Sequence, residues 1–283
     1  MRRVLYSLAA VGAPHCERQW IASIRSLRRH NPHVPVRLSV FGSPAPETLA
    51  EARRQCVEVM FNGRYDAHLE AAAPGRGGLL ATNPTLHKIA SMAGLPAGPG
   101  QVLYLDCDTF CFGDVAALFD HYAGVHFQAR EEPGSRRSPN GYDPSYVDEA
   151  ALEALARGLG LAFVPPYNTG VMMLNGGLWT RLAELFGEFL DFVWRLSPRR
   201  DDGTQGLPFP SNNAWIIEEV ATWLTLGRFP DLTHAPFELR HVAQNGEAGR
   251  LLAARRAPGL AHYFSAGEDE FFAALKAASG LAA

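Results

Sequence analysis

The chain has 283 residues, of which 47% are hydrophobic and 19% charged, and its formal net charge is −3. This is the composition of a folded globular protein. It excludes a strongly basic nucleic-acid-binding surface, because no run of Lys and Arg is longer than two residues. No apolar stretch approaches the roughly 20 residues of a membrane span, so no transmembrane segment is expected.

The N-terminus pairs two arginines with a short apolar stretch, as a signal peptide does. Tyr6 and Ser7 interrupt the stretch and Pro14 ends it, so we interpret it as a first buried strand. The cysteines of the chain are Cys16, Cys56, Cys107 and Cys111. They form no CxxC pair, and we expect free thiols in a reducing compartment. The protein is therefore expected to be cytoplasmic, with peripheral attachment to a membrane left open.

The first part of the chain alternates short apolar segments with amphipathic ones. Strands are expected over residues 4–8, 36–41, 57–61 and 101–105, and helices over residues 19–29, 47–55 and 83–94. This strand–helix rhythm predicts an α/β fold with a mostly parallel sheet and helices on both faces.

The second part is more mixed. Strands are expected over residues 125–129, 169–174 and 260–264, and helices over residues 148–157, 178–196, 213–226 and 268–278. Two polar segments, residues 131–146 and 197–210, are expected to be loops, the first of them a lid over a binding site.

A pair of acidic residues follows one of the predicted buried strands. Asp106 and Asp108 come directly after residues 101–105. Ligands of open α/β sheets bind beyond the carboxyl ends of the strands, and residues i and i+2 of an extended chain point to one side. Adjacent carboxylates repel each other unless a cation lies between them, and Mn²⁺ or Mg²⁺ takes oxygen ligands and bridges diphosphates. The pair therefore predicts a metal–diphosphate site, with two exposed acids in a turn as the alternative.

An Asp-x-Asp motif after a strand also occurs in haloacid-dehalogenase-type phosphatases, in the pattern Asp-x-Asp-x-Thr/Val. Here the residue two places after Asp108 is Phe110, and the threonine comes one place early, at Thr109. That motif normally follows the first strand of a chain, whereas this one follows a later strand. The phosphatase interpretation is therefore disfavoured.

Four segments of the chain resemble the GT-A glycosyltransferases, most closely the glycogenin-like and lipopolysaccharide-galactosyltransferase family (family 8). They are residues 102–119, similar to the family's YLDxDxxxxxDxxxLF segment, residues 85–89, residues 167–175, similar to its FNxGVxxxN strand, and residues 261–264. The resemblance implies a Rossmann-like GT-A fold with a mixed C-terminal acceptor half. Residues 1–283 would form a single domain, with a nucleotide-binding lobe over 1–108 and an acceptor-binding, metal-completing lobe over 109–283.

The resemblance also implies a set of site residues. Asp106, Asp108 and His262 would hold Mn²⁺ or Mg²⁺. Lys88, Asp106 and Asn168 would bind the donor, the lysine through its charge and the asparagine through its amide. From the residues alone, Lys88 is also consistent with a solvated helix lysine, Asn168 with a turn, and His262 with a half-buried histidine at a strand end.

Two other residues of these segments are expected to have structural roles at helix N-termini. Asp114 fits the N-cap of the helix that follows the acidic segment. Asn175 is expected to cap the helix that follows its strand.

The chain departs from the family in two places. Residues 266–270, Ala-Gly-Glu-Asp-Glu, replace the family's Gly-x-x-Lys-Pro-Trp, so a phosphate-binding lysine is missing and closure over the diphosphate is in doubt. The family's Asp-Gln pair near the anomeric carbon has its nearest match in Glu218 and Glu219. We predict that these glutamates are catalytic, as a general base or beside the reaction centre, with simple helix-surface acids as the alternative. The stereochemistry stays open.

The sequence thus predicts a metal-dependent glycosyltransferase of hexosyltransferase type. It would move a sugar from a nucleotide-diphosphate sugar, with a UDP-sugar favoured, to a hydroxyl of a glycan, lipid-linked sugar or small molecule. One alternative is a non-catalytic GT-A-like protein that binds nucleotide or carbohydrate. Another is a sugar nucleotidyltransferase, which needs a Gly-rich phosphate loop with an Arg. Residues 8–18 offer only Gly12 and Arg18 for such a loop.

Overall fold

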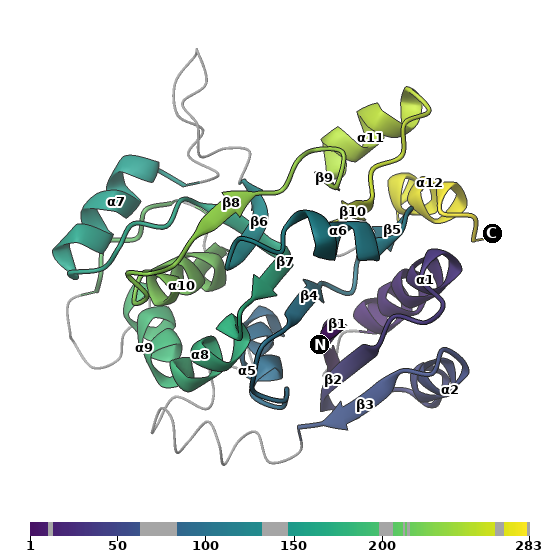
Figure 1. Ribbon diagram of the computed structural model, residues 1–283, viewed down its shortest axis with the longest axis horizontal. Helices are drawn as coiled ribbons and strands as arrows, with labels where there is room; N and C mark the ends of the chain where they lie inside the picture. The colour runs from purple at the N-terminus through teal and green to yellow at the C-terminus, as the bar shows by residue number, and fades with distance from the viewer. Residues whose placement is uncertain are drawn as a thin grey trace.

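The computed structural model describes residues 1–10, 14–62, 84–131, 147–197, 206–211, 213, 216–263 and 269–281. Its main sheet has seven strands in the order β3-β2-β1-β4-β7-β6-β8 (Figure 1). They are β1 (Arg2–Ala10), β2 (Val36–Gly42), β3 (Glu58–Phe61), β4 (Gln101–Leu105), β6 (Phe127–Glu131), β7 (Tyr167–Asn175) and β8 (His234–Pro236).

Most neighbouring strands of this sheet run parallel. Parallel pairing joins β3, β2, β1 and β4 in turn, and also joins β6 to β8. Only β7 runs against its neighbours β4 and β6. Because β7 is antiparallel to β4, its first half lies beside the carboxyl end of β4, where Leu105 pairs with Val171. The predicted mostly parallel α/β sheet is confirmed.

Helices cover both faces of the sheet, as expected (Figure 1). They are α1 (Pro14–His30), α2 (Pro46–Arg54), the short 3-10 helix η1 (Pro84–Leu86), α5 (His87–Met92), α6 (Val115–His121), α7 (Glu149–Gly158), α8 (Leu178–Glu184), α9 (Phe186–Leu196), α10 (Ile217–Leu226), α11 (Asn245–Ala253) and α12 (Glu270–Ala278). One apolar cluster joins α5, α8, α9 and α10 to one face, and another joins α1 and α6 to the opposite face.

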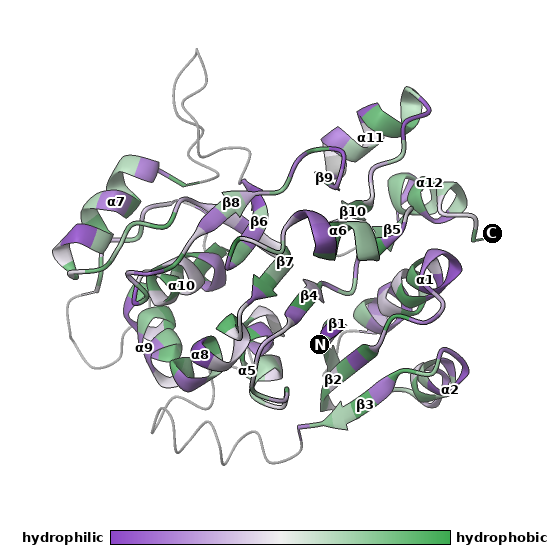
Figure 2. Ribbon diagram, in the orientation of Figure 1, coloured by the Kyte–Doolittle hydropathy of each residue, from purple (hydrophilic) through white to green (hydrophobic). Residues whose placement is uncertain are grey.

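The strand before the acidic pair shows why the strands of this sheet are continuous apolar runs in the sequence. All residues of β4 are buried. Val102 and Tyr104 belong to the cluster that includes α8 to α10, whereas Leu103 and Leu105 belong to the cluster that includes α1. Successive side chains of a strand point to opposite faces, and here both faces are covered. Figure 2 shows hydrophobic residues in β2, β4 and β7 at the middle of the molecule.

A small second sheet, of order β5-β10-β9, completes the fold. Its strands are β5 (Thr109–Cys111), β9 (Val242–Gln244) and β10 (Leu260–His262). The antiparallel pairing of β5 with β10 sets His262 opposite Thr109. Of these strands only β10 was predicted, as part of an apolar segment over residues 260–264. The strands β5 and β9 are three residues long, which is too short to show an alternating pattern. The helix α11 was also missed, since Gly246 and Gly249 interrupt its pattern.

Two local predictions were wrong. The single helix expected over residues 178–196 is two helices, separated at Leu185 (φ −90°, ψ 13°), with the weak helix former Gly187 just beyond. Asn175 does not cap α8, whose N-cap is Gly177. Its side-chain amide instead donates to the carbonyls of Tyr122, at 2.7 Å, and Val125, and so ties β7 to the segment after α6.

Other local predictions are confirmed. Asp114 caps α6 by accepting the backbone N–H of Ala116 at 2.8 Å, and all four cysteines are free. None of the helices in the described ranges combines the length and apolar character needed to cross a membrane. The expected lid lies outside the described residues apart from Glu131, as do residues 198–205 of the second loop and the departure at 266–268.

Candidate active site

The two acidic residues lie in the turn that joins β4 to β5. Asp106 follows β4 directly, and its backbone N–H donates to the Gly170 carbonyl on β7 at 2.7 Å. Its own carbonyl accepts the N–H of Thr109 at 3.1 Å, which closes the turn. The Asp108 carbonyl accepts the N–H of Tyr263 at 3.1 Å, just beyond β10. These backbone hydrogen bonds, to β7 and to the residue after β10, therefore fix the backbone positions of Asp106 and Asp108.

His262, the last residue of β10, brings an imidazole to the same turn. Its Nε2 lies 3.3 Å from Asp108 Oδ1 and 3.7 Å from Asp106 Oδ2. Ligand atoms of the three residues all lie within 4.8 Å of one another. Two carboxylates and an imidazole are a suitable donor set for Mn²⁺ and related divalent cations. The structure thus brings together the three residues predicted to hold the metal.

The surroundings of His262 differ from those of an ordinary core histidine. Gly170 packs against its ring so closely that a Cβ there would overlap the imidazole. The side chain is 4% exposed. Burial alone would lower the pKa of His262, but the negative charges of Asp108 and Asp106 outweigh it and raise that pKa. The imidazole is therefore held against two carboxylates, not against apolar surface alone.

Lys88 on α5 lies at the centre of a buried polar network. Its Nζ lies 3.1 Å from Asp106 Oδ2 and 3.2 Å from Glu218 Oε2, and it donates to Thr169 Oγ1 at 2.9 Å. Burial alone would lower the pKa of Lys88, but the charges of Asp106, Glu218 and Glu219 raise it, so the ammonium keeps its charge. The side chain is 7% exposed, and the alternative of a solvated helix lysine is wrong.

Glu218 and Glu219 begin α10 and point inward. Glu218 accepts from Thr169 Oγ1 at 3.1 Å and from Thr222 Oγ1 at 3.2 Å, and Glu219 accepts the backbone N–H of Thr169 at 3.0 Å. They are 1% and 7% exposed, so the alternative of helix-surface acids is wrong. Burial raises the pKa of Glu218 and Lys88 lowers it again in part. Both acids are therefore buried near the ammonium group of Lys88.

Asn168 lies at the start of β7, one residue before this network. Its Oδ1 accepts the backbone N–H of Gly170 at 3.0 Å, and its amide NH₂ can still donate to a ligand. The register between β6 and β7 shifts at Ala129 and Arg130, so Asn168 pairs with Arg130 beside a bulge. Asn168 is thus part of a strand, and the turn that the sequence allowed here as an alternative is wrong. A donor contact by Asn168 stays a prediction.

A cleft opens beside the acidic turn, beyond the carboxyl ends of β1 and β4. Its lining comes from β1, α1, the helix that carries Lys88, and the turn itself: Ser7, Ala9, Cys16, Gln19, Thr85, Lys88, Tyr104, Asp106, Cys107 and Asp108. Strand ends of this kind are where ligands bind in open α/β sheets. The acidic pair is thus at an accessible edge, with Asp106 and Asp108 side chains 24% and 16% exposed.

No family model matches the sequence, and no curated protein sequence matches it. Solved structures do match. The structure of mouse xyloside xylosyltransferase 1, in its apo form, is similar with a TM-score of 0.53 at 14% identity, over 93% of this chain and 97% of that one. The galactosyltransferase LgtC, in a complex with donor and acceptor sugar analogues, is similar with a TM-score of 0.54 at 15% identity, over 98% of this chain and 95% of that one. The chain has the GT-A glycosyltransferase fold.

Within this GT-A fold, two residues of the site were not predicted from the sequence. Tyr104 donates from its hydroxyl to Asp106 Oδ1 at 2.7 Å and so orients that carboxylate. Its position two residues before Asp106 on an extended strand was an available signal, because such residues share a side. Thr169 links Lys88 to Glu218 and Glu219, and nothing in its local sequence indicates this, since its partners come from two distant helices.

Proposed function

We propose that this chain is a metal-dependent glycosyltransferase that transfers a sugar from a nucleotide-diphosphate sugar to an acceptor hydroxyl. The observation that carries the proposal is the meeting of Asp106, Asp108 and His262 with the cation Lys88 at the edge of the cleft. A cluster of oxygen and imidazole donors next to a fixed ammonium suits a diphosphate with its divalent counterion. LgtC binds donor and acceptor sugar analogues on the same fold, which supports a sugar donor and a sugar acceptor here.

In this proposal Asp106, Asp108 and His262 hold Mn²⁺ or Mg²⁺. When bound, the ion acts as a Lewis acid that stabilises the negative charge of the leaving diphosphate. The hydroxyl of Tyr104 donates to one oxygen of Asp106, which leaves the other, 3.1 Å from Lys88 Nζ and 3.7 Å from His262 Nε2, for the ion. The close contact between Gly170 and His262 sets how far the ring reaches toward the two carboxylates.

The donor sugar and nucleotide are assigned to the two sides of the cleft. The nucleoside is assigned to the part of the cleft that Ser7 and Ala9 on β1 and Gln19 on α1 line. Lys88 and the free amide of Asn168 would orient the sugar and its phosphates. Their charge and hydrogen-bonding groups are already positioned by Thr169 and Gly170, so binding requires little rearrangement of these side chains.

Glu218 and Glu219 are proposed as the catalytic carboxylates behind the sugar. Glu218 shares Lys88 with Asp106, so it places a buried negative charge next to the ammonium that contacts the metal-binding turn. A negative carboxylate near the anomeric carbon stabilises the positive charge that develops there when the glycosidic bond breaks. A role as general base requires that Glu218 or Glu219 reach an acceptor hydroxyl when both substrates are bound.

The test is nucleotide-sugar binding measured by thermal shift, with UDP-, GDP- and TDP-sugars, each with Mn²⁺ and with a chelator. We expect at least one donor, most readily a UDP-sugar, to raise the melting temperature only when Mn²⁺ is present. The Asp108→Asn variant is expected to lose that rise, while His33→Ala, a change at an exposed histidine outside the cleft, keeps it. If no nucleotide-sugar stabilises the wild-type chain in a metal-dependent way, the proposal fails.

Turnover separates the enzyme from its alternatives. A glycosyltransferase releases a nucleoside diphosphate from the bound donor, faster when an acceptor is added. Release of pyrophosphate from a nucleoside triphosphate and a sugar phosphate would indicate a sugar nucleotidyltransferase instead. Metal-dependent donor binding with no release of nucleoside diphosphate, across glycan and small-molecule acceptors, would indicate a non-catalytic binding protein.

A further inference from the structure

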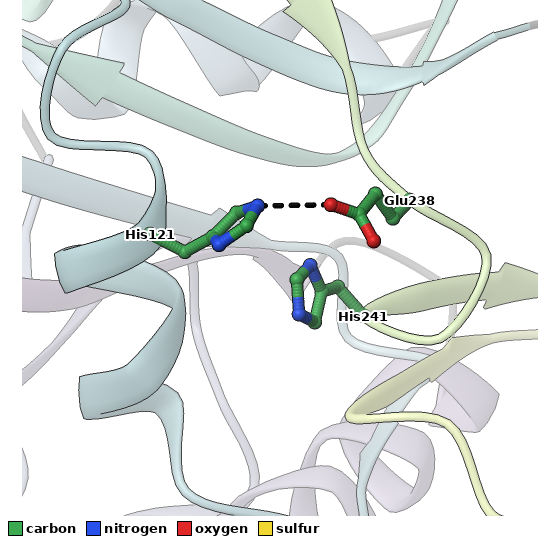
Figure 3. Close-up of side chains that lie close together, drawn as sticks. All are labelled: His121, Glu238 and His241. Atoms are coloured by element: carbon green, nitrogen blue, oxygen red, sulfur yellow. Dashed lines mark hydrogen bonds and ion pairs between the residues drawn. The ribbon is translucent and has the colours of Figure 1, made fainter.

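A second group of potential metal ligands lies outside the cleft. His121 ends α6, and Glu238 and His241 lie on the turn between β8 and β9 (Figure 3). His121 Nε2 lies 2.9 Å from Glu238 Oε1, and the rings of His121 and His241 have centroids 4.8 Å apart. One nitrogen or oxygen atom from each of the three residues lies within 4.8 Å of the others. The three side chains converge from two elements far apart in sequence.

The turn that carries two of these residues is firmly held. Its closing bond runs from the His241 N–H to the Glu238 carbonyl at 2.8 Å. The His241 carbonyl accepts the N–H of Leu260 at 2.8 Å, which fastens the turn to the start of β10. Glu238 and His241 therefore keep a fixed spacing, and they move with the strand that ends at His262.

Tyr122, the neighbour of His121, joins the turn to α6. Its hydroxyl accepts the backbone N–H of Glu238 at 3.0 Å and lies 2.7 Å from Nδ1 of His241. On the other side, Arg240 Nε donates to Glu238 Oε2 at 2.7 Å, so that Oε1 is left facing His121. These contacts hold the carboxylate and the imidazole in place. Because Nδ1 of His241 is already bonded to Tyr122, an ion would bind Nε2 of that ring or displace the tyrosine hydroxyl from Nδ1.

We propose that His121, Glu238 and His241 form a second divalent cation site, selective for Zn²⁺-type ions. Two imidazoles and one carboxylate favour Zn²⁺ and similar transition metals over Mg²⁺, which prefers oxygen ligands alone. Three protein ligands leave a fourth position for water or another donor, because Zn²⁺ is usually four-coordinate. His121 and Glu238 have side chains 42% and 46% exposed, so an ion can reach them from solvent.

A bound ion would clamp α6 to the turn before β9. This link would restrain the two strands next to the acidic turn, β5 and β10. The helix α6 follows β5, and the turn between β8 and β9 is hydrogen-bonded to the start of β10. The inference does not depend on the function proposed above, because none of the three residues lines the cleft. Loss of one site is expected to leave the other able to bind its ion.

The test is equilibrium binding of Zn²⁺ to the full-length, chelator-treated protein, measured by competition with a chromophoric chelator. The wild type is expected to bind Zn²⁺ at this site. In the His241→Ala and His121→Ala variants, the affinity of the site for Zn²⁺ should decrease by more than about tenfold. Asp108→Asn is expected to keep this binding and lose only binding in the cleft.

Matched controls keep the result interpretable. His33→Ala removes an exposed histidine elsewhere and should change nothing. Circular dichroism in excess chelator establishes that each variant folds, and His121→Ala, at an exposed helix end, serves if His241→Ala does not. Glu238→Gln keeps a hydrogen-bond acceptor for His121 but removes the anionic ligand, so it should also weaken Zn²⁺ binding. The deciding comparison is made in the Asp108→Asn background, in which binding in the cleft is removed. If Zn²⁺ there binds the His121 and His241 variants as tightly as it binds their parent, the cluster is only a hydrogen-bonded contact and the proposal is wrong.

Discussion

Lys88 joins one carboxylate from each of two acidic pairs, and the two pairs differ in their access to solvent. Glu218 and Glu219, the inner pair, are buried and accept hydrogen bonds from Thr169, and Glu218 also pairs with Lys88. Asp106 and Asp108, the outer pair, face the cleft beside His262, and Asp106 pairs with the same lysine. The inner pair is therefore held in place by the chain away from solvent, whereas the outer pair lies at an open edge where a cation can reach it.

The largest expected effect comes from removing the ion that the two pairs share. Lys88→Met leaves Glu218 buried without its cation, and loss of one partner of a buried ion pair typically costs about 3–5 kcal/mol. We expect a decrease of that size in the free energy of unfolding, measured by urea denaturation. The combined change Lys88→Met with Glu218→Gln should recover part of the loss, because the buried charge is then gone. If the double variant is no more stable than Lys88→Met, then the buried charge of Glu218 is not the cause.

The next largest effect is on function and concerns the outer pair. Asp108→Asn keeps the size of the side chain and removes one anionic ligand at the cleft edge. We expect Mn²⁺ affinity and sugar transfer to decrease by at least about 100-fold, since even changes to residues that only orient metal ligands cost 10- to 100-fold. The unfolding free energy in chelator should hardly change, in contrast to Lys88→Met. A variant with normal Mn²⁺ affinity would contradict the proposed metal site.

A smaller effect tests the packing of Gly170, on β7, against the ring of His262 in the proposed metal site. A Cβ at Gly170 would overlap the ring of His262, and inserting a methyl group into a packed site typically costs about 1–3 kcal/mol. Gly170→Ala is expected to lower stability by that amount and also to weaken Mn²⁺ binding, because the imidazole must move. Gly124→Ala is the matched control, since a Cβ there meets no atom within 4 Å. Stability lost without any change in Mn²⁺ affinity would separate the glycine from the metal site.

The fold and the outer pair could be predicted from sequence for a physical reason. The residues of β4 form an apolar run because both faces are covered, and Asp106 and Asp108 follow that run directly, so local pattern and site coincide. His262 was found only through the resemblance, because its partners lie far away in the sequence. Its position depends on the pairing of β10 with β5, and β5 is too short to leave a pattern of its own.

The burial of Glu218 and Glu219 could not be predicted from a local sequence pattern. Glu218 and Glu219 open a helix, where acidic residues usually face solvent and favour the helix dipole. Their burial results from tertiary contacts with Lys88 and Thr169, which come from α5 and β7. The same holds for His121, Glu238 and His241, which no motif connects. Sequence patterns predict elements well, but they do not predict which polar groups of distant elements meet.

The smallest expected effect is a pH dependence of stability that should reverse when metal is bound. The pKa of His262 is raised above its ordinary value of 6.5. Without metal, its contact with Asp108 and Asp106 should therefore stabilise the fold fully below about pH 6.5 and lose its effect as pH rises through the raised pKa. With Mn²⁺, only the neutral imidazole can be a ligand, so metal affinity should increase over the same pH range. Melting temperatures between pH 5.5 and 8.5, in chelator and in Mn²⁺, test both slopes. His262→Gln should remove both slopes, and His33→Ala should keep them. Equal slopes in wild type and His262→Gln would mean that another group responds to pH, and that the imidazole is not the residue that links the acidic turn to the ion.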